Sequence, residues 1–284
     1  IAGFGSVRDF STSVKREKMI LELDIGNSRV KWRQITDDGN VINKGIVPGA
    51  KELREQAELA LKPTAIRACS VRKGDAYEEV KDWLESKYEI PVETADVKRH
   101  WGGVSIQYED PSRLGVDRWL AMLAAYSTVK GACIIVDAGT ALTIDVLAAD
   151  GCHQGGYILP GLALMRASLE QNTAIRLNAG SIPASLALGH STDQAVWNGG
   201  LALAVALIEK TVMETSAGKV VNLIFSGGDG QILAANTDSW ALTVSNSITD
   251  TKNIRVEQVP DLVLDGLCIA CPLPVQTIGS GSKN

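Results

Sequence analysis

Leu21-Glu-Leu-Asp-Ile-Gly-Asn-Ser28 is the first of two copies of a pattern that decides the fold of this chain. The second copy is Ile134-Ile-Val-Asp-Ala-Gly-Thr140. In each copy a short apolar strand ends in Asp-x-Gly followed by Asn or Thr, and the chain then turns into a second strand. The aspartate offers a hard oxygen to a cation or its bound water, and the glycine lets backbone N–H groups approach an anion. The pattern therefore predicts two cradles for phosphate groups.

One copy alone would have an ordinary explanation. An isolated Asp-x-Gly is explained equally well by a hairpin in which both residues satisfy turn geometry. Two copies favour the functional interpretation, because a repeated strand-turn-strand cradle is typical of a pseudo-symmetric enzyme that holds a nucleotide between two lobes. We therefore expect an α/β protein with its site in the cleft between the lobes.

Length and charge exclude some other classes of protein. The chain has 284 residues, of which 45% are hydrophobic and 21% charged, and this suffices for two modest domains. Its formal net charge of −5 and its dispersed lysines and arginines argue against nucleic acid as the main partner. No apolar run approaches the length of a membrane span, and the N-terminal segment lacks the apolar stretch of a secretory signal. We expect a cytoplasmic protein.

Cysteine and histidine give no sign of a metal centre. The cysteines are Cys69, Cys133, Cys152, Cys268 and Cys271, an odd and scattered set that predicts no disulfide framework. Cys268 and Cys271 have redox or metal spacing, but a structural helix face is favoured because no second pair accompanies them. The histidines, His100, His153 and His190, are isolated in the sequence, so no metal-histidine site is predicted.

Local patterns divide the chain into four parts. We expect a tag or disordered flank over 1–18, an N-terminal lobe over 19–118, a C-terminal lobe over 119–275 and a disordered tail over 276–284. The first lobe is predicted to contain strands from Met19, at Val30–Arg33, Val41–Ile46, Thr64–Ser70 and Pro91–Glu93, and helices at Lys51–Leu61, Asp75–Lys87 and Arg113–Val129. The second is predicted to contain strands at Ala132–Val136, Leu142–Leu147, Gly155–Ile158 and Val220–Phe225, and helices at Leu162–Asn172, Asp193–Glu214 and Leu262–Ala270. The two lobes look like copies of one plan, which resembles an actin-like or ribonuclease H-like ATPase core.

A third glycine-rich turn, Gly227-Gly-Asp-Gly230, directly follows an apolar strand. Such a turn lets the backbone approach a flat base or a ribose closely, although a tight strand-to-helix turn would have the same sequence. Together with the two cradles it fits the adenosine side of the same cleft.

The stretch that joins the lobes, Tyr108 to Trp119, carries the candidate chemistry. Asp117 and Arg118 are adjacent, and Gly115 precedes them. One interpretation is a helix N-cap beside a surface arginine. The other is a base that takes a hydroxyl proton beside a fixed cation that holds an anionic group. Phosphoryl transfer asks for little more than positioning and neutralisation of charge.

At this point the chain resembles the bacterial type III pantothenate kinases. The resemblance runs in order from Met19 to about Pro274. The strings that carry it are Asp24-x-Gly-Asn-x-x-x-Lys31, Gly115-Val-Asp-Arg-Trp119, Val136-Asp-Ala-Gly-Thr-Ala141, Gly155-Gly-Tyr-Ile-x-Pro-Gly161, Ser226-Gly-Gly-Asp-Gly230 and Leu262-Val-Leu-x-Gly-Leu267.

The resemblance implies a role for each matching residue. ATP would be bound by Asp24, Ile25, Gly26, Asn27, Ser28, Arg29, Val30, Lys31, Thr140, Gly227 and Gly228. Pantothenate would be bound by Tyr108, Gly115, Val116, Asp117, Arg118 and Thr192, with Asp117 as the catalytic base and Arg118 near the carboxylate. Asp137 would bind the monovalent cation, K⁺ or NH₄⁺, that the family requires besides Mg²⁺. Thr192 would reach the substrate from the partner subunit of a homodimer.

Two other functions remain open on the sequence. A kinase for another small hydroxyl substrate, such as a sugar, would share the fold. A non-catalytic regulatory accessory protein would use the fold to sense nucleotide. The intact set of Asp24, Asp117, Arg118 and Asp137 argues against the second, since a pure sensor could lose Asp117 without losing ATP binding.

Overall fold

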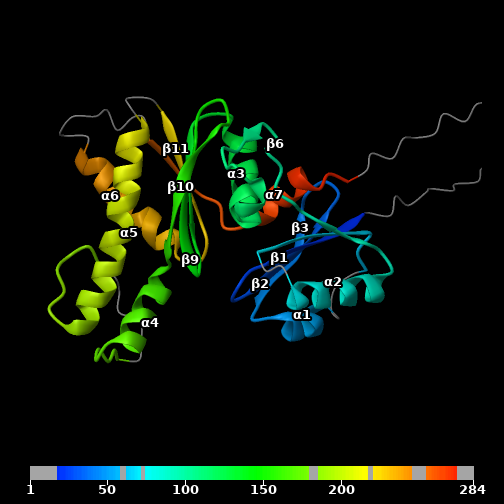
Figure 1. The fold of residues 1–284 in the computed structure, drawn as a ribbon, viewed down its shortest axis with the longest axis horizontal. Coiled ribbons are helices and arrows are strands. Elements are labelled where there is room, and N and C mark those ends of the chain that lie inside the picture. Colours follow the sequence, from blue (N-terminus) through cyan, green and yellow to red (C-terminus); the bar gives the residue numbers. More distant parts are fainter. Residues whose placement is uncertain are drawn as a thin grey trace, which may run out of the picture.

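The computed structural model describes residues 18–57, 62–71, 74–178, 185–216, 220–244 and 254–273. The predicted flanks therefore lie outside the described residues, apart from Lys18. The described chain forms two five-stranded sheets with two helices between them (Figure 1).

The first sheet has the strand order β3-β2-β1-β4-β5. Its strands are β1 (Met19–Ile25), β2 (Val30–Thr36), β3 (Val41–Val47), β4 (Ala65–Ser70) and β5 (Val92–Thr94). β1, β2 and β3 form an antiparallel meander, whereas β4 and β5 continue from β1 in parallel. The parallel strands need crossover helices, which are α1 (Ala50–Ala57) and α2 (Asp75–Tyr88). Both lie on the outer side of this sheet (Figure 1).

The second sheet repeats this plan with the order β10-β9-β8-β11-β12. Its strands are β8 (Cys133–Ala138), β9 (Ala141–Leu147), β10 (His153–Pro160), β11 (Val221–Ser226) and β12 (Ile254–Gln258). The meander β8-β9-β10 is again antiparallel, and β11 and β12 are again parallel to β8. The crossover helices are α4 (Leu162–Asn172), α5 (Thr192–Ser216) and α6 (Gly230–Val244). The duplication therefore extends to every strand of the two five-stranded sheets, and the predicted actin-like fold of two lobes is confirmed.

The final helix of each repeat lies between the sheets. These helices are α3 (Val116–Val129) and α7 (Leu262–Ala270), and they pack on each other. Trp119, Leu120, Leu123 and Leu267 are fully buried in the core that the pair forms. Because α3 is apolar on almost every side, it is a central helix and places its first turn at the cleft.

The predicted elements are present, with ends that differ by a few residues. The start of the helix predicted at Arg113–Val129 is wrong: Pro111–Arg113 forms a short 3-10 helix (η1), and α3 begins at Val116. Gly115 separates the two, because its φ of −58° and ψ of 132° are not helical. The described part of the helix predicted at Lys51–Leu61 is α1, and residues 58–61 lie outside the description.

Some elements were missed altogether. They are the hairpin of β6 (His100–Trp101) and β7 (Val104–Ser105), helix α6 and strand β12. The hairpin strands are too short to show alternation, and β12 is an edge strand with largely exposed residues. All five cysteines lie in described segments, where each is a free thiol.

Among the described helices, α5 is long and apolar enough over Thr192–Thr215 to match a membrane span by length and composition. The sequence prediction of no such run overlooked this segment. In the structure Leu201, Val205 and Ile208 of this helix are buried against the second sheet, so α5 packs as a core helix.

Candidate active site

The two predicted cradles lie face to face. The turn after β1 carries Ser28 and the turn after β8 carries Thr140, and the Thr140 hydroxyl lies 3.2 Å from the Ser28 hydroxyl oxygen. The two residues are 112 positions apart in the sequence, and both side chains are exposed. The repeated strand-turn-strand pattern therefore brings its two polar arms to one point between the sheets.

Glycine is required where the third turn meets the second. Gly227 has a φ of +82°, which side chains rarely adopt. A Cβ there would lie 2.4 Å from the Ala138 carbonyl oxygen and 2.6 Å from Asp137 Oδ1. At Gly228, by contrast, a Cβ would have no neighbour within 4 Å. The β11 turn is thus held against the Asp137 turn, with open space at its next residue.

Three carboxylates face this junction from three elements. Asp24 and Asp137 lie near the ends of β1 and β8, and Asp117 is in the first turn of α3. Burial raises the pKa of Asp137, the positive charge of Lys31 lowers it, and the negative charge of Asp117 raises it again. Lys31 is thus the cation that the carboxylates of β1 and β8 share.

The pKa of Asp24 is raised as well. Burial raises its pKa from 3.8 to about 6, Lys31 opposes the rise, and the charges of Asp117 and Asp137 add to it. The Cys69 thiol donates a hydrogen bond to Asp24 Oδ1 at 3.5 Å. Such a rise means that the negative charge at Asp24 is only partly compensated.

Asp117 lies in the first turn of α3 and is not the N-cap residue of this helix. Gly115 occupies the cap position, and the Arg118 backbone N–H donates to Asp117 Oδ1 at 2.8 Å. A Cβ on Gly115 would lie 2.5 Å from Asp117 Oδ1, so glycine makes room for the carboxylate. Burial raises the pKa of Asp117, and the Arg118 backbone hydrogen bond opposes the rise.

Arg118 is buried, so the interpretation of a surface arginine is wrong. Its Nε and Nη2 donate to Asp145 Oδ2 and Oδ1 at 2.9 and 2.6 Å, and its Nη1 donates to the Tyr108 hydroxyl at 3.1 Å. Although burial disfavours the charged form, these contacts with Asp145 raise the pKa of Arg118. Bidentate pairing fixes the guanidinium plane and aims one edge at Tyr108.

Two residues of this cluster were missed by the sequence analysis. Asp145 is 1% exposed in β9, and His153 Nε2 lies 2.9 Å from its Oδ1. The His153 ring stacks on Tyr108 with centroids 6.0 Å apart, and its Nδ1 is buried without a hydrogen-bond partner. A charged residue between Ile144 and Val146 in an apolar strand was the signal for Asp145. His153 was interpreted as isolated, although the fold brings it to Asp145.

The donors fit a hydrated cation better than a closed metal cage. In the described parts of the chain, no three His, Cys, Asp or Glu side chains meet as a metal-binding group. Mg²⁺ is commonly held by one or two carboxylates together with water and substrate phosphates. Partly buried carboxylates with raised pKa values, such as Asp24 and Asp137, supply this kind of site.

The third turn also faces the first. Burial raises the pKa of Asp229, and the positive charge of Arg29 lowers it. Arg29 therefore lies within electrostatic reach of the β11 turn. The predicted nucleotide-binding residues from the turns after β1, β8 and β11 thus come together.

Space for a second ligand lies beside the Asp117 turn. A cavity of about 730 Å³ is lined by Gly115 and Val116, by Ser70 and Thr94 at the ends of β4 and β5, and by Gly74 before α2. Predicted pantothenate-binding residues thus border open space. Thr192, the first residue of α5, is exposed and does not line this cavity.

Comparison with known proteins gives one consistent family. A family model described as type III pantothenate kinase matches residues 20–214. A protein of that name from Pseudomonas putida (strain W619) is 37% identical over 265 residues, which cover 90% of this chain and 100% of the relative. A protein of the same name from Azotobacter vinelandii is 33% identical over 267 residues, with the same coverage.

Solved structures agree on the fold. A conserved protein from Campylobacter jejuni, described as a candidate Baf family transcriptional activator, aligns with a TM-score of 0.54 and 24% identity over 87% of this chain and 94% of its own. A candidate 2-dehydro-3-deoxygalactonokinase from Sinorhizobium meliloti aligns with a TM-score of 0.50 and 17% identity over 88% and 97%. At these identities the likeness concerns the fold alone.

Proposed function

Since this chain belongs to the type III pantothenate kinase family, we propose that it transfers the γ-phosphoryl group of ATP to the primary hydroxyl of pantothenate, with Asp117 as the base. The product would be 4′-phosphopantothenate, and the reaction is the first step of coenzyme A biosynthesis. The observation that carries the proposal is the meeting of both phosphate turns with Asp117 in one cleft.

The turns hold the nucleotide. Backbone N–H groups of residues 24–31 and the hydroxyls of Ser28 and Thr140 would bind phosphate oxygens from the two sides of the cleft. Gly227 and Gly228 would leave room for the adenosine end. Lys31 carries the positive charge beside the phosphates. Mg²⁺, when bound with the nucleotide, would neutralise charge on the phosphates, and Asp24 is the carboxylate that would hold it.

Asp117 is suited to accept the hydroxyl proton. Its carboxylate has Oδ1 occupied by the Arg118 backbone N–H, which fixes the orientation of the group. Burial raises the pKa of this carboxylate, which strengthens it as a base. The proton would pass to Asp117 as the hydroxyl oxygen attacks the γ-phosphorus and ADP leaves.

The cluster behind Asp117 would orient pantothenate. Arg118 shares its charge with Asp145, so it can hold the substrate carboxylate through the edge that it presents to Tyr108. Gly115 and Val116 would contact the substrate through their backbone, beside the adjoining cavity. In this proposal Arg118 would hold the anionic end of the substrate, and Asp117 would act as base at its hydroxyl.

We also propose that the reaction requires a monovalent cation. K⁺ or NH₄⁺ would bind at Asp137, whose charge is only partly offset by Lys31. The expected result is faster turnover in potassium or ammonium than in sodium, with the difference lost in Asp137→Asn.

We also propose a cytoplasmic homodimer in which Thr192 reaches the partner's substrate. The second lobe exposes large apolar side chains on β10, α4 and α5, namely Ile158, Leu164, Leu169 and Leu203. Exposed apolar side chains on neighbouring elements of one lobe support an interface there. Light scattering of the wild type should give the mass of two chains, and Leu203→Glu should reduce it to the mass of one chain. A wild-type monomer that turns over at full rate would contradict the dimer.

The deciding experiment measures ADP release from MgATP with and without pantothenate. We expect pantothenate-dependent turnover in the wild type and a decrease of about 10² to 10⁴-fold in kcat for Asp117→Asn, because the variant cannot accept the proton. The control is Asp110→Asn, which changes an exposed carboxylate seven residues earlier on the surface. Equal kcat in wild type and Asp117→Asn would remove Asp117 as the base.

The same assay separates the alternative functions. Turnover with a sugar but not pantothenate would indicate the kinase for another hydroxyl substrate. Nucleotide binding with no turnover on any acceptor would favour the regulatory protein.

A further inference from the structure

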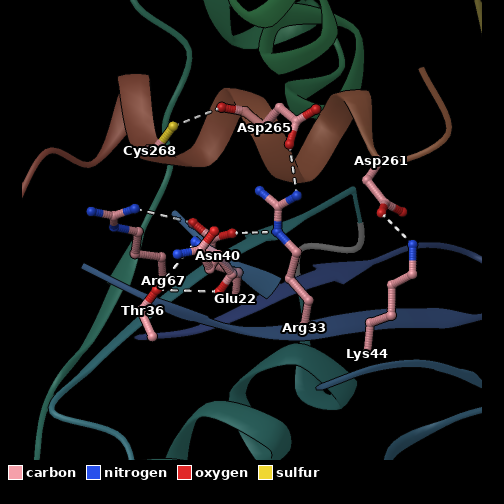
Figure 2. A network of polar contacts seen from close by, with 9 residues as sticks. All are labelled: Glu22, Arg33, Thr36, Asn40, Lys44, Arg67, Asp261, Asp265 and Cys268. Atoms are coloured by element: carbon pink, nitrogen blue, oxygen red, sulfur yellow. Dashed lines mark hydrogen bonds and ion pairs between the residues drawn. The ribbon is translucent and has the colours of Figure 1, made fainter. Parts of the chain in front are cut away.

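A buried network of charges joins the first sheet to α7 (Figure 2). Arg33 Nε donates to Glu22 Oε2 at 2.7 Å, and Arg67 Nη1 donates to Glu22 Oε1 at 3.0 Å. Arg33 Nη1 also donates to Asp265 Oδ1 at 2.6 Å. The side chains of Glu22, Arg33 and Arg67 are at most 7% exposed, whereas that of Asp265 is 41% exposed. Two carboxylates and two guanidinium groups thus form a network with one exposed end.

The network lies one step along the strands from the proposed ATP site. Glu22 pairs in register with Arg33 and Arg67, and two residues later Asp24 pairs with Lys31 and Cys69. Side chains two residues apart in a strand share a face of the sheet, about 7 Å from each other. The same three strands therefore present the ion network and then the phosphate-binding row.

Helix α7 carries the network to the other half of the site. Gly266 follows Asp265, and a Cβ on Gly266 would lie 2.3 Å from the carbonyl oxygen of Leu120 in α3. The two helices therefore touch through their backbones at this point, with no flexible side chain between them. Since α3 begins with Val116 and Asp117, its position decides where the proposed base lies.

A buried ion pair is weak evidence for a contribution to stability, because desolvation offsets much of the attraction. Its directional contacts do fix geometry. Here one exposed carboxylate ends a chain of contacts from Glu22 through Arg33 to the backbone of α7. This arrangement is better suited to holding the first sheet in a fixed position relative to α7 and α3 than to stabilising a single hydrophobic core.

We propose that Asp265 is a positioning residue: through Arg33 and Glu22 it aligns the phosphate-binding row, Asp24 and Lys31, with Asp117 on α3. This inference rests on the proposed function for its kinetic readout. It also makes a claim about nucleotide binding, since the two halves of the nucleotide site belong to the two sheets that α7 and α3 separate.

The test uses the full chain and three variants. Asp265→Ala removes the contact at a partly exposed helical site where alanine is a good helix former. Asp265→Asn keeps an acceptor oxygen in the same place. Lys44→Ala is the matched control, because it breaks a second ion pair from this sheet, Lys44 Nζ to Asp261 Oδ2 at 2.9 Å (Figure 2). Lys44 lies on the edge strand β3, and Asp261 is the residue before α7.

Each variant is assayed for pantothenate turnover at saturating ATP, well below its melting temperature. For Asp265→Ala we expect kcat to fall at least about tenfold, because small misplacement of reacting groups is costly. The pantothenate KM should stay within about twofold, since Tyr108 and Arg118 belong to the α3 side. Asp265→Asn should recover part of kcat, and Lys44→Ala should match the wild type.

A merely stabilising role would lower the melting temperature and leave kcat unchanged, and this result would overturn the inference. So would a rise in pantothenate KM with kcat preserved. Failure of the proposed function is a separate outcome, seen as no turnover in the wild type. In that case calorimetric binding of ADP decides: a Kd at least about threefold higher in Asp265→Ala than in Lys44→Ala supports positioning, and equal values refute it.

Discussion

Replacing Asp24 by asparagine should stabilise the folded protein and lower its ATP-dependent turnover. The carboxylate at this position is held in a partly buried site beside Asp117 and Asp137, and its pKa is raised from 3.8 to about 6. Because the folded pKa lies above the unfolded value, the folded state binds the proton more tightly. Ionised Asp24 therefore lowers the free energy of unfolding. This penalty grows as pH rises from the unfolded pKa of 3.8 to the folded pKa of about 6.

The size of this penalty follows from the shift. At pH 8 it amounts to about 3 kcal/mol, and at pH 4.5 to about 1 kcal/mol, because most of the titration in the folded state lies between these pH values. Asparagine is isosteric and neutral, so Asp24→Asn should gain up to these amounts. The gap between variant and wild type should widen by about 2 kcal/mol across this pH range.

The assay is urea unfolding of wild type and Asp24→Asn at both pH values, without nucleotide, followed by ATP-dependent turnover at pH 8. We expect higher unfolding midpoints for the variant, more so at pH 8, and reduced turnover because the carboxylate that faces the nucleotide site is gone. A variant that is no more stable at pH 8, or whose gain is the same at both pH values, would refute the reasoning.

Three further changes have directions that the structure sets. Asp145→Asn leaves the buried Arg118 guanidinium without its countercharge, so the melting temperature should fall, at a cost of about 3 to 5 kcal/mol, and pantothenate KM should rise. Gly161→Ala places a Cβ 2.2 Å from the carbonyl oxygen of Gly139, which should displace the second phosphate turn and raise the ATP KM several-fold in steady-state kinetics. Lys31→Met removes the cation that lowers the pKa of Asp24, so this pKa should rise. As pH is lowered, nucleotide binding measured by calorimetry should therefore weaken at a higher pH than in the wild type.

The sequence sufficed for the fold because the duplicated motif lies at a structurally decisive place. Each copy of Asp-x-Gly ends the first strand of its sheet, and the apolar runs beside it predict the meander that follows. The turn at Gly115 was also visible as a glycine before Asp117, although its effect on the start of α3 was not. Helix boundaries depend on backbone angles that propensity alone does not determine.

The rest of the site depends on pairing across elements. Arg118, Asp145 and His153 come from α3, β9 and β10, and no spacing in the sequence reveals that they share one cluster. Glu22 in Leu21-Glu-Leu looks like a residue on a polar face of a strand, yet it is 0% exposed. Its burial follows from α7, a helix at the other end of the chain, and from two arginines whose strand register only the fold establishes.

The contact between Arg33 and Asp265 spans 232 residues, and this has a consequence for how the protein is made. At ordinary elongation rates a ribosome takes roughly 10 to 50 seconds to synthesise that length of chain. During that time the first sheet can pair its strands and cover one face with α1 and α2, but α7 does not yet exist to cover the other. A nascent chain therefore presents a half-finished N-terminal lobe to the cell, and a message truncated before α7 would leave it so permanently.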